Sequence, residues 1–295
     1  MNSFSISELQ KYSGIKAHTI RVWEQRYNAL KPDRSEGNTR YYNAQQLKRL
    51  LNIVSLMKSD YKVSDLCSFT DNKLSEMLET EMNKSTDESN QFQYYILQII
   101  SAAILFNESH FEKMFSGSVL RFGLRSTYVN IIYPSLVRLG ILWTRDDLAP
   151  AQEHFISNLM RQKILSATDA LPPAETDKPS WLLFLPEDEF HEMGLLYSQY
   201  LLRLARLPVY YLGSNVPFDA VQAAVKAVNP DNLLFFIVTK IENDGDHHYI
   251  NQIADSFKSK TVYVACSSDK IKGLVKPANV KTLTESDALE KLLPL

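Results

Sequence analysis

The sequence predicts a multidomain chain of the α and α/β classes, and three observations lead to that prediction. Two short helical stretches, a hairpin-like segment and two further helical stretches fill the first 70 residues. Helical periodicity follows from 92 to 170, and beyond residue 180 short apolar runs alternate with amphipathic stretches. A chain of 295 residues is also long for one hydrophobic core. We therefore predict domains at 1–75, 92–172 and 180–295, with a connector at 76–91.

Composition indicates a soluble, cytoplasmic protein. Apolar residues make up 45% of the chain and charged residues 22%, which is ordinary for a globular protein. The longest apolar run, 94–106, contains Gln98 and Ser101 and is too short to span a bilayer; no leader-like segment opens the chain. Two cysteines, Cys67 and Cys266, cannot build a disulfide framework or a zinc site. We expect no membrane contact.

Charge is distributed unevenly along the chain. Residues 1–58 contain ten Lys/Arg and four Asp/Glu, a net charge of +6, so the remaining residues must sum to −8 to give the total of −2. A basic N-terminal segment on an acidic body is typical of a protein that meets a polyanion through that segment. The alternative is a basic surface helix without a nucleic-acid role.

The basic segment has the pattern of a helix-turn-helix. Ser5 and Glu8 have the spacing of a capping box before a first helix, and Gly14 is suited to the turn. A second helix follows, with apolar residues at spacings of three and four. These residues are Ile20, Trp23, Tyr27 and Leu30.

A β-wing is predicted next, from the Pro- and Gly-containing segment "KPDRSEGNTRYYN". The wing and the outer face of the second helix carry side chains suited to phosphates and base edges. The candidate DNA contacts are His18, Thr19, Arg21 and Arg26 on the helix, and Arg34, Arg40 and Tyr42 on the wing. Helices are expected at 44–60 and 62–69. The run "HTIRVWEQRY…LKPDRSEGNTRYY" resembles the winged helix-turn-helix of MerR-type transcription regulators, which implies binding to a double-stranded DNA operator.

The middle of the chain is predicted to be a four-helix bundle. Residues 79–91 are polar and aperiodic, which indicates a connector, and they show no heptad for a dimerising coiled coil. The four expected helices are 92–106, 111–123, 126–143 and 149–171.

Residues 180–295 are predicted to form a Rossmann-like parallel sheet with helices on both faces. Expected strands are 181–185, 207–212, 233–238, 261–265 and 280–283; expected helices are 191–206, 218–228, 246–259 and a final one at the C-terminus. "EDEFHEMG" follows the first strand, at the edge where open α/β sheets bind ligands. His191 is a candidate metal ligand there, with Glu189 to hold its other ring nitrogen and Gly194 to let a bulky group approach. The alternative is a helix N-terminus with acidic first-turn residues.

The same segment resembles the D/E-x-H-x-x-G motif of cobalamin-binding domains. That resemblance implies that His191 is the lower axial ligand of cobalt. "YLGSNVP" matches the loop after the second strand of such domains, and "TKI" stands for their S-x-L, with the Thr239 hydroxyl facing the nucleotide tail.

A second motif, W-x9-EH, lies in the predicted bundle. Trp143, Glu153 and His154 form it. The pattern resembles that of cobalamin-dependent MerR regulators, including light-sensing repressors of carotenoid synthesis, in which the bundle caps the corrin. The resemblance implies a homo-oligomer formed through the C-terminal domains and gated by adenosylcobalamin or methylcobalamin.

Three positions depart from that family. Ala265 and Cys266 stand where its fourth strand ends in Gly-Gly, so each added Cβ is expected to crowd the nucleotide tail. Thr144 stands where light-sensing members carry the histidine that binds cobalt after photolysis, so that adduct is not expected here.

The main interpretation is a transcription regulator of the repressor kind, gated by cobalamin bound between bundle and α/β domain. The first alternative is a regulator whose sensor domain has lost cobalamin and acts through protein contacts or another small ligand. The second is a cobalamin-dependent methyltransferase or mutase. It is disfavoured because no separate catalytic domain, P-loop or G-x-G-x-x-G motif is present.

Overall fold

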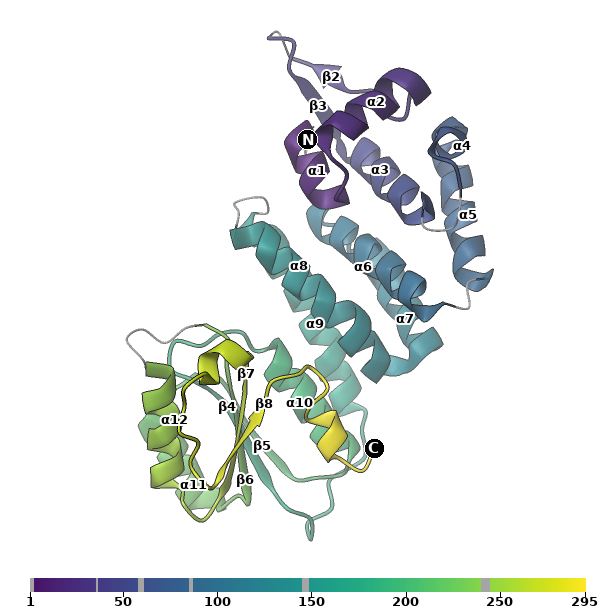
Figure 1. The fold of residues 1–295 in the computed structure, drawn as a ribbon. Helices are drawn as coiled ribbons and strands as arrows, with labels where there is room; N and C mark the ends of the chain where they lie inside the picture. Colours follow the sequence, from purple (N-terminus) through teal and green to yellow (C-terminus); the bar gives the residue numbers. More distant parts are fainter. Residues whose placement is uncertain (1–2, 36, 58–60, 85–86, 145–148, 240–244) are drawn as a thin grey trace. The chain divides into compact units, whose positions relative to one another are not determined.

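The computed structural model describes residues 3–35, 37–57, 61–84, 87–144, 149–239 and 245–295. The chain divides into two compact units, residues 1–159 and 160–295 (Figure 1). Within the described residues, none of the helices combines the length and the apolar character needed to cross a membrane.

The predicted helix-turn-helix is present at the start of the first unit. Helix α1 (Ile6–Ser13) begins with the expected capping box between Ser5 and Glu8, and Gly14 ends it with φ 77°. Helix α2 (Ala17–Tyr27) follows, with Ile20 and Trp23 buried. The left-handed backbone at Gly14 is one that a residue with a Cβ adopts only at a cost, so this glycine makes the tight turn possible.

The wing is also present, with one strand that the sequence did not indicate. Strands β2 (Asp33–Arg34) and β3 (Arg40–Asn43) pair antiparallel, and β1 (Ser3–Ser5) pairs with the other edge of β3. Helices α3 (Ala44–Leu56) and α4 (Val63–Ser68) complete the domain. Residues 58–60, at the end of the predicted 44–60 helix, lie outside the described residues.

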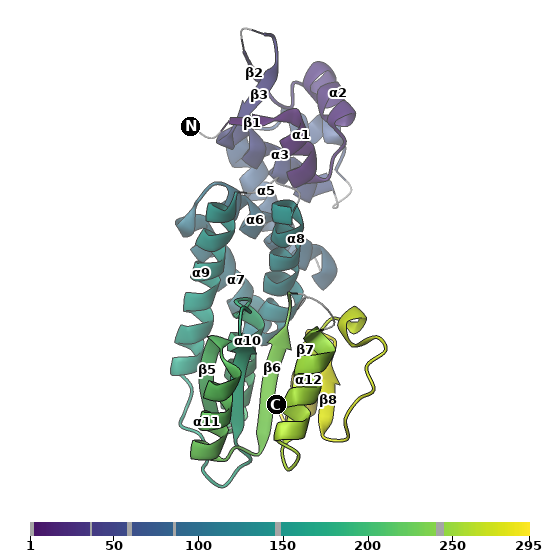
Figure 2. The ribbon, with the colours of Figure 1, turned by 90° about the vertical axis from the view of Figure 1, so that its left-hand side faces the viewer.

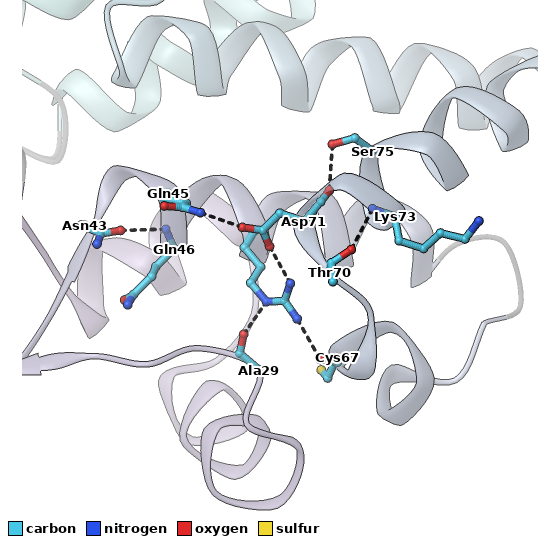
Figure 3. A network of polar contacts seen from close by, with 10 residues as sticks. Ala29, Asn43, Gln45, Gln46, Cys67, Thr70, Asp71, Lys73 and Ser75 are labelled. Atoms are coloured by element: carbon cyan, nitrogen blue, oxygen red, sulfur yellow. Dashed lines mark hydrogen bonds and ion pairs between the residues drawn. The ribbon is translucent and has the colours of Figure 1, made fainter.

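Arg49 of α3 links separate segments of this domain through hydrogen bonds to Ala29, Cys67 and Asp71, all three of which Figure 3 labels. Its guanidinium donates to the Ala29 carbonyl at 2.8 Å, to the Cys67 carbonyl at 2.8 Å and to Asp71 Oδ1 at 2.6 Å. Gln45 adds a bond of 3.0 Å to the other oxygen of Asp71. Burial raises the pKa of Asp71, but the bonds from Arg49 and Gln45 outweigh it and hold that pKa below its ordinary value. One cation thus links the end of α2 to α4 and to the following helix.

The predicted connector at 76–91 is wrong for the described residues. Helix α5 runs from Asp71 to Lys84, and α6 begins at Glu88. Leu74 and Leu78 are buried one turn apart, and α5 packs against α3. Two apolar side chains at this spacing suffice to dock a narrow helix face, and the polar residues around them occupy the remaining surface.

The four helical segments predicted for the middle of the chain are present (Figure 2). They are α6 (Glu88–Ile104), α7 (Glu108–Thr127), α8 (Tyr133–Thr144) and α9 (Pro150–Asp169). A π-helical segment, η2 (Tyr128–Ile132), connects α7 to α8, and Gly123 interrupts α7 with φ 75° and ψ 163°. The boundary between the two units falls inside α9.

Helix α6 packs on both the bundle and the winged domain. All its residues from 95 to 104 are buried, and it contacts α3 as well as α7. A buried polar chain crosses this joint. Gln98 Nε2 donates to Asn52 Oδ1 of α3 at 3.2 Å, and Gln98 Oε1 lies 2.9 Å from His110 Nε2 of α7. Arg138 of α8 adds a bond of 3.2 Å to the Tyr12 carbonyl. The winged domain is therefore packed against the bundle within the first unit.

The second unit contains the predicted parallel sheet. Its strands are β4 (Trp181–Pro186), β5 (Val209–Val216), β6 (Asn232–Ile237), β7 (Thr261–Cys266) and β8 (Val280–Leu283). All pairs are parallel, and the order across the sheet is β5-β4-β6-β7-β8. The chain order therefore reverses between β4 and β6, which is where open α/β sheets bind ligands.

Helices cover both faces of this sheet, as predicted (Figure 1). Helix α10 (Met193–Leu204) covers one face, and α11 (Phe218–Val228) and α12 (Gly245–Ser256) cover the other. The prediction of a final α-helix is wrong, because the last helical element of the described residues is a short 3-10 turn, Glu290–Leu292.

Candidate DNA interface and cofactor site

Helix α2 presents a polar outer face. His18, Arg21 and Arg26 are exposed and Thr19 is partly exposed, while Ile20 and Trp23 point into the core. Tyr27, which the apolar pattern placed on the inner face, is 36% exposed because the helix ends there and Asn28 turns left-handed. The cationic face predicted for this helix is therefore available to a polyanion.

The wing carries one exposed arginine and one tethered arginine. Arg34 is exposed, and its guanidinium donates to the Asn38 side chain within the wing turn. Arg40 Nε lies 3.3 Å from Glu24 Oε2, and 27% of its side chain is exposed. Arg40 is therefore held against α2, where Glu24 offsets part of its charge.

The prediction that Tyr42 contacts DNA is wrong for this structure. Its ring is completely buried, and its hydroxyl donates to Glu24 Oε1. Burial, and then the bond to Glu24, raise the pKa of Tyr42. Successive side chains alternate along β3, so Tyr42 points inward. The prediction from the Arg and Tyr residues of the wing did not take this alternation into account. Glu24 is the residue that sequence reasoning missed: it connects the wing to α2.

The loop after β4 places Glu189 and His191 at the switch point of the sheet. Glu189 is 4% exposed, and its Oε1 lies 2.7 Å from His191 Nδ1 and accepts the His191 backbone N–H at 3.0 Å. Its Oε2 accepts the N–H groups of Val238 and Thr239 at 2.8 and 2.7 Å and the Thr239 hydroxyl at 2.8 Å. One carboxylate thus joins the loops that follow β4 and β6.

These contacts determine the tautomer of His191. Burial raises the pKa of Glu189, but the bonds from His191 and Thr239 outweigh it and hold that pKa well below its ordinary value. An ionised carboxylate only accepts, so His191 Nδ1 carries the proton in this contact, and the lone pair of the neutral ring is on Nε2. The His191 side chain is 51% exposed. This arrangement matches the support that metal-binding histidines usually have.

The loop itself is anchored from the β5 side. Asp188, with φ 62°, donates its N–H to Asn215 Oδ1 at 3.0 Å, and Asn215 returns its own N–H to the Glu189 carbonyl at 3.1 Å. Asn215 also has a positive φ, of 56°. Asn and Asp tolerate this conformation better than other non-glycine residues, so the "GSN" near the end of β5 was an available sequence signal.

The role predicted for Gly194 needs correction. A Cβ on Gly194 would lie 2.5 Å from Phe236 Cε1, so this glycine admits the β6 ring against α10 rather than a ligand. The Thr239 hydroxyl donates to Glu189, and Thr239 is exposed, so its contact with a nucleotide tail stays a prediction. Lys240 and Ile241, the rest of "TKI", lie outside the described residues.

Ala265 and Cys266 end β7 on opposite faces of the sheet. Cys266 packs against the core under α11 and α12, and burial raises its pKa to about 11. Ala265, one position earlier, is 6% exposed and points to the α10 face because successive side chains alternate. The expectation that both Cβ atoms crowd one passage is therefore wrong: at most one methyl group is added on the α10 face.

The W-x9-EH residues belong to α8 and α9. Trp143 is 47% exposed, a large apolar surface for a helix side chain. His154 is exposed and its Nδ1 lies 3.1 Å from Glu153 Oε2. The Thr144 side chain and residues 145–148 lie outside what the structure describes.

The possible metal-binding side chains of this site suit a metal that is already coordinated by most of its ligands. No group of three or more His, Cys, Asp or Glu side chains within the described ranges could hold a bare metal ion. Cobalamin would bring most of the ligands of its cobalt and take one nitrogen from the protein, which His191 Nε2, with the ring oriented by Glu189, would supply. The residues of the β4 loop therefore fit cobalamin.

The fold and these two sites define a DNA-binding protein of the helix-turn-helix class that carries a ligand-binding module. Residues 4–68 match the family model "MerR HTH family regulatory protein", and residues 96–165 match the model "B12 binding domain". The chain therefore combines a MerR-type DNA-binding domain with a B12-binding domain, the composition of a cobalamin-gated transcription regulator.

Two relatives from Myxococcus xanthus resemble most of the chain. The HTH-type transcriptional repressor CarH is 26% identical over 232 residues, which cover 78% of this chain and 77% of CarH. The HTH-type transcriptional repressor CarA is 26% identical over 228 residues, 77% of this chain and 73% of CarA. Among solved structures, the monomethylamine corrinoid protein of Methanosarcina barkeri shares the fold, with TM-score 0.54 and 13% identity, over 68% of this chain and 97% of that protein.

Proposed function

We propose that the protein is a transcription repressor whose binding to operator DNA is gated by cobalamin, with His191 as the lower axial ligand of cobalt. The observation that carries this proposal is the Glu189 carboxylate, which orients His191 and joins the β4 and β6 loops at the switch point. When bound, the cofactor supplies a cobalt centre that takes one protein nitrogen. The chain's own residues hold that nitrogen in place, because Glu189 binds the other ring nitrogen.

Operator contacts are assigned to the outer face of α2 and to the wing. His18, Thr19, Arg21 and Arg26 face outward on the helix, and Arg34 is exposed on the wing. Arg40 remains in the assignment as a tethered charge, because 27% of its side chain is exposed. Phosphate neutralisation by these cations would supply the sequence-independent part of the affinity.

The same proposal assigns Trp143, Glu153 and His154 to the cofactor's opposite side. Exposed Trp143 and the polar pair on α9 support it. Bound cobalamin favours one assembly of the chain, provided that the assemblies differ in affinity for it. We propose that this assembly is a homo-oligomer built by the bundle and the α/β domain, because one winged domain offers few base contacts.

Regulation rather than catalysis is the proposed role. The supporting observation is that the B12-binding region is joined to a DNA-binding domain that packs directly against its helices. Adenosylcobalamin and methylcobalamin are both candidate cofactors, and the axial nitrogen of His191 does not discriminate between them.

The test is dark incubation of the purified protein with adenosylcobalamin, followed by its absorbance spectrum and by sedimentation. We expect loading at micromolar cobalamin, a histidine-ligated spectrum and a larger species that binds selected duplexes. His191→Ala should weaken loading and change the spectrum to one without a lower nitrogen ligand. His248→Ala, a matched change at an exposed histidine of α12, should load like wild type.

The variant Ala265→Gly tests whether the methyl group of Ala265 blocks the nucleotide tail of cobalamin. If wild type does not load but this variant does, the methyl group on the α10 face blocks the tail. If neither protein takes up cobalamin, the cofactor assignment is wrong, and the sensor domain acts through another ligand or through protein contacts.

A further inference from the structure

Glu192, the residue after His191, is held from two sides. Its side chain is 13% exposed, and its Oε1 accepts the Tyr211 hydroxyl of β5 at 2.7 Å. Its Oε2 lies 3.0 Å from Arg161 Nη2 of α9. Burial, and then the bond to Glu192, raise the pKa of Tyr211, so this hydroxyl stays protonated and donates. A strand and a helix therefore fix the position of one carboxylate.

The backbone of Glu192 connects that carboxylate to the His191 turn. Its N–H donates to the Phe190 carbonyl at 2.8 Å, and its own carbonyl accepts the Leu196 N–H at 2.9 Å, as the N-cap of α10. His191 thus stands between two anchored residues: Glu189 ties it to β6, and Glu192 ties it to β5 and α9. A displacement of Glu192 must move the turn that carries the imidazole.

We propose that Arg161 and Glu192 are positioning residues for His191, and that through them the affinity for cobalamin depends on the placement of α9. This inference rests on the proposed function. Helix α9 also carries Glu153 and His154, two turns before Arg161. An event that shifts this helix would change the His191 turn, and cobalamin bound at His191 would in turn favour one placement of α9, because coupling between sites is reciprocal.

The experiment compares Arg161→Gln, Glu192→Gln and the double variant with wild type. Each single change should raise the dissociation constant for adenosylcobalamin about three- to tenfold, less than the 10–100-fold typical of a direct partner of a metal ligand. The double variant should bind adenosylcobalamin no more weakly than the weaker-binding single variant, because both changes remove the same interaction. Arg161→Lys, which keeps the charge, should restore part of the affinity.

A second measurement uses the protein without cobalamin. Amide hydrogen exchange across 191–196 should be faster in Arg161→Gln than in wild type, because the N-terminal turn of α10 has lost an anchor. Gln162→Ala, an exposed neighbour on the same helix, is the matched control and should change neither quantity. Arg161 is about half exposed, so its replacement leaves the fold intact even if Glu192→Gln does not fold.

Two outcomes separate this inference from the proposed function. If wild type loads cobalamin and both single variants load equally well with unchanged exchange, the positioning role is wrong while the cofactor assignment stands. If neither wild type nor Ala265→Gly loads cobalamin, the cofactor assignment fails. Hydrogen exchange then still decides whether Arg161 orders the His191 turn.

Discussion

Two buried carboxylates, Glu24 and Glu189, organise the two candidate sites at the scale of single residues. Glu24 accepts the Tyr42 hydroxyl and pairs with Arg40, and Glu189 accepts from His191 and from the loop after β6. A buried charge is tolerated only when donors surround it. Each carboxylate therefore fixes the groups around it, and neither needs to touch a ligand to affect binding.

Glu189→Gln should weaken cobalamin loading about 10–100-fold, the usual effect of losing a partner of a metal ligand. The amide has one acceptor oxygen in place of two, so it cannot hold both His191 and the β6 loop. Absorbance titration in the dark measures the effect. Glu187→Gln, at an exposed position of the same loop, is the matched control. Equal loading by the two variants would contradict the role given to Glu189.

Tyr42→Phe should lower the free energy of unfolding by about 1.5–3 kcal/mol, the range for a hydrogen bond to a charged group. The ring stays in its buried place and Glu24 loses one donor. Urea unfolding and DNA binding are measured together. A fall in DNA affinity with unchanged stability would show that Tyr42 contacts the duplex after all.

At the scale of elements, α2 and the wing form one reading surface because Glu24 joins them. The exposed cations lie on the outer face of α2 and on the wing turn, while Arg40 is held between the two elements. Exposed cations should therefore account for more of the salt dependence than Arg40 does. Spacing along the chain does not give this ranking, because it treats Arg21, Arg26, Arg34 and Arg40 alike.

Arg26→Ala should reduce the slope of log affinity against log salt by about 0.9, the value for one phosphate contact on B-DNA. It should weaken binding to all duplexes to a similar degree. Lys226→Ala, an exposed cation of α11, is the control and should leave the slope unchanged. A slope that is the same for both variants would remove Arg26 from the interface.

At the scale of the whole molecule, the winged domain and the bundle behave as one body within the first unit. Asn52, Gln98 and His110 form a polar chain across their joint, and burial, followed by Lys48 and Lys113, lowers the pKa of His110 to about 4. The ring is therefore neutral in the folded protein at neutral pH. A DNA-binding domain fixed in this way moves together with the bundle.

This joint predicts a pH dependence of stability. Between the unfolded pKa of about 6.5 and the folded pKa of about 4, the unfolded chain binds a proton at His110 and the folded chain does not. Stability should therefore fall as the pH falls through that window. Urea unfolding at pH 7 and pH 5 should show a larger loss for wild type than for His110→Gln. Equal losses would mean that His110 is not buried in solution.

Much of the architecture was predictable from local pattern. Periodicity places the four bundle helices and the five parallel strands. Gly14 marks the turn between the first two helices, and the order of motifs places His191 after the first strand of the sheet. These features depend on neighbours in sequence, and the spacing of residues along the chain records them directly.

Packing between distant segments decided the rest. Tyr42 is buried because side chains alternate along β3 and because Glu24 accepts its hydroxyl. Gly194 leaves room for the Phe236 ring, and Thr239 donates to Glu189. Residues 76–84 are helical because α3 offers α5 a surface. Local sequence patterns are enough to predict which elements form and which residue types reach the two sites. They do not predict which side chains are held inward, because the partner of a side chain can lie about fifty residues away, as Thr239 does from Glu189, and leaves no local signal.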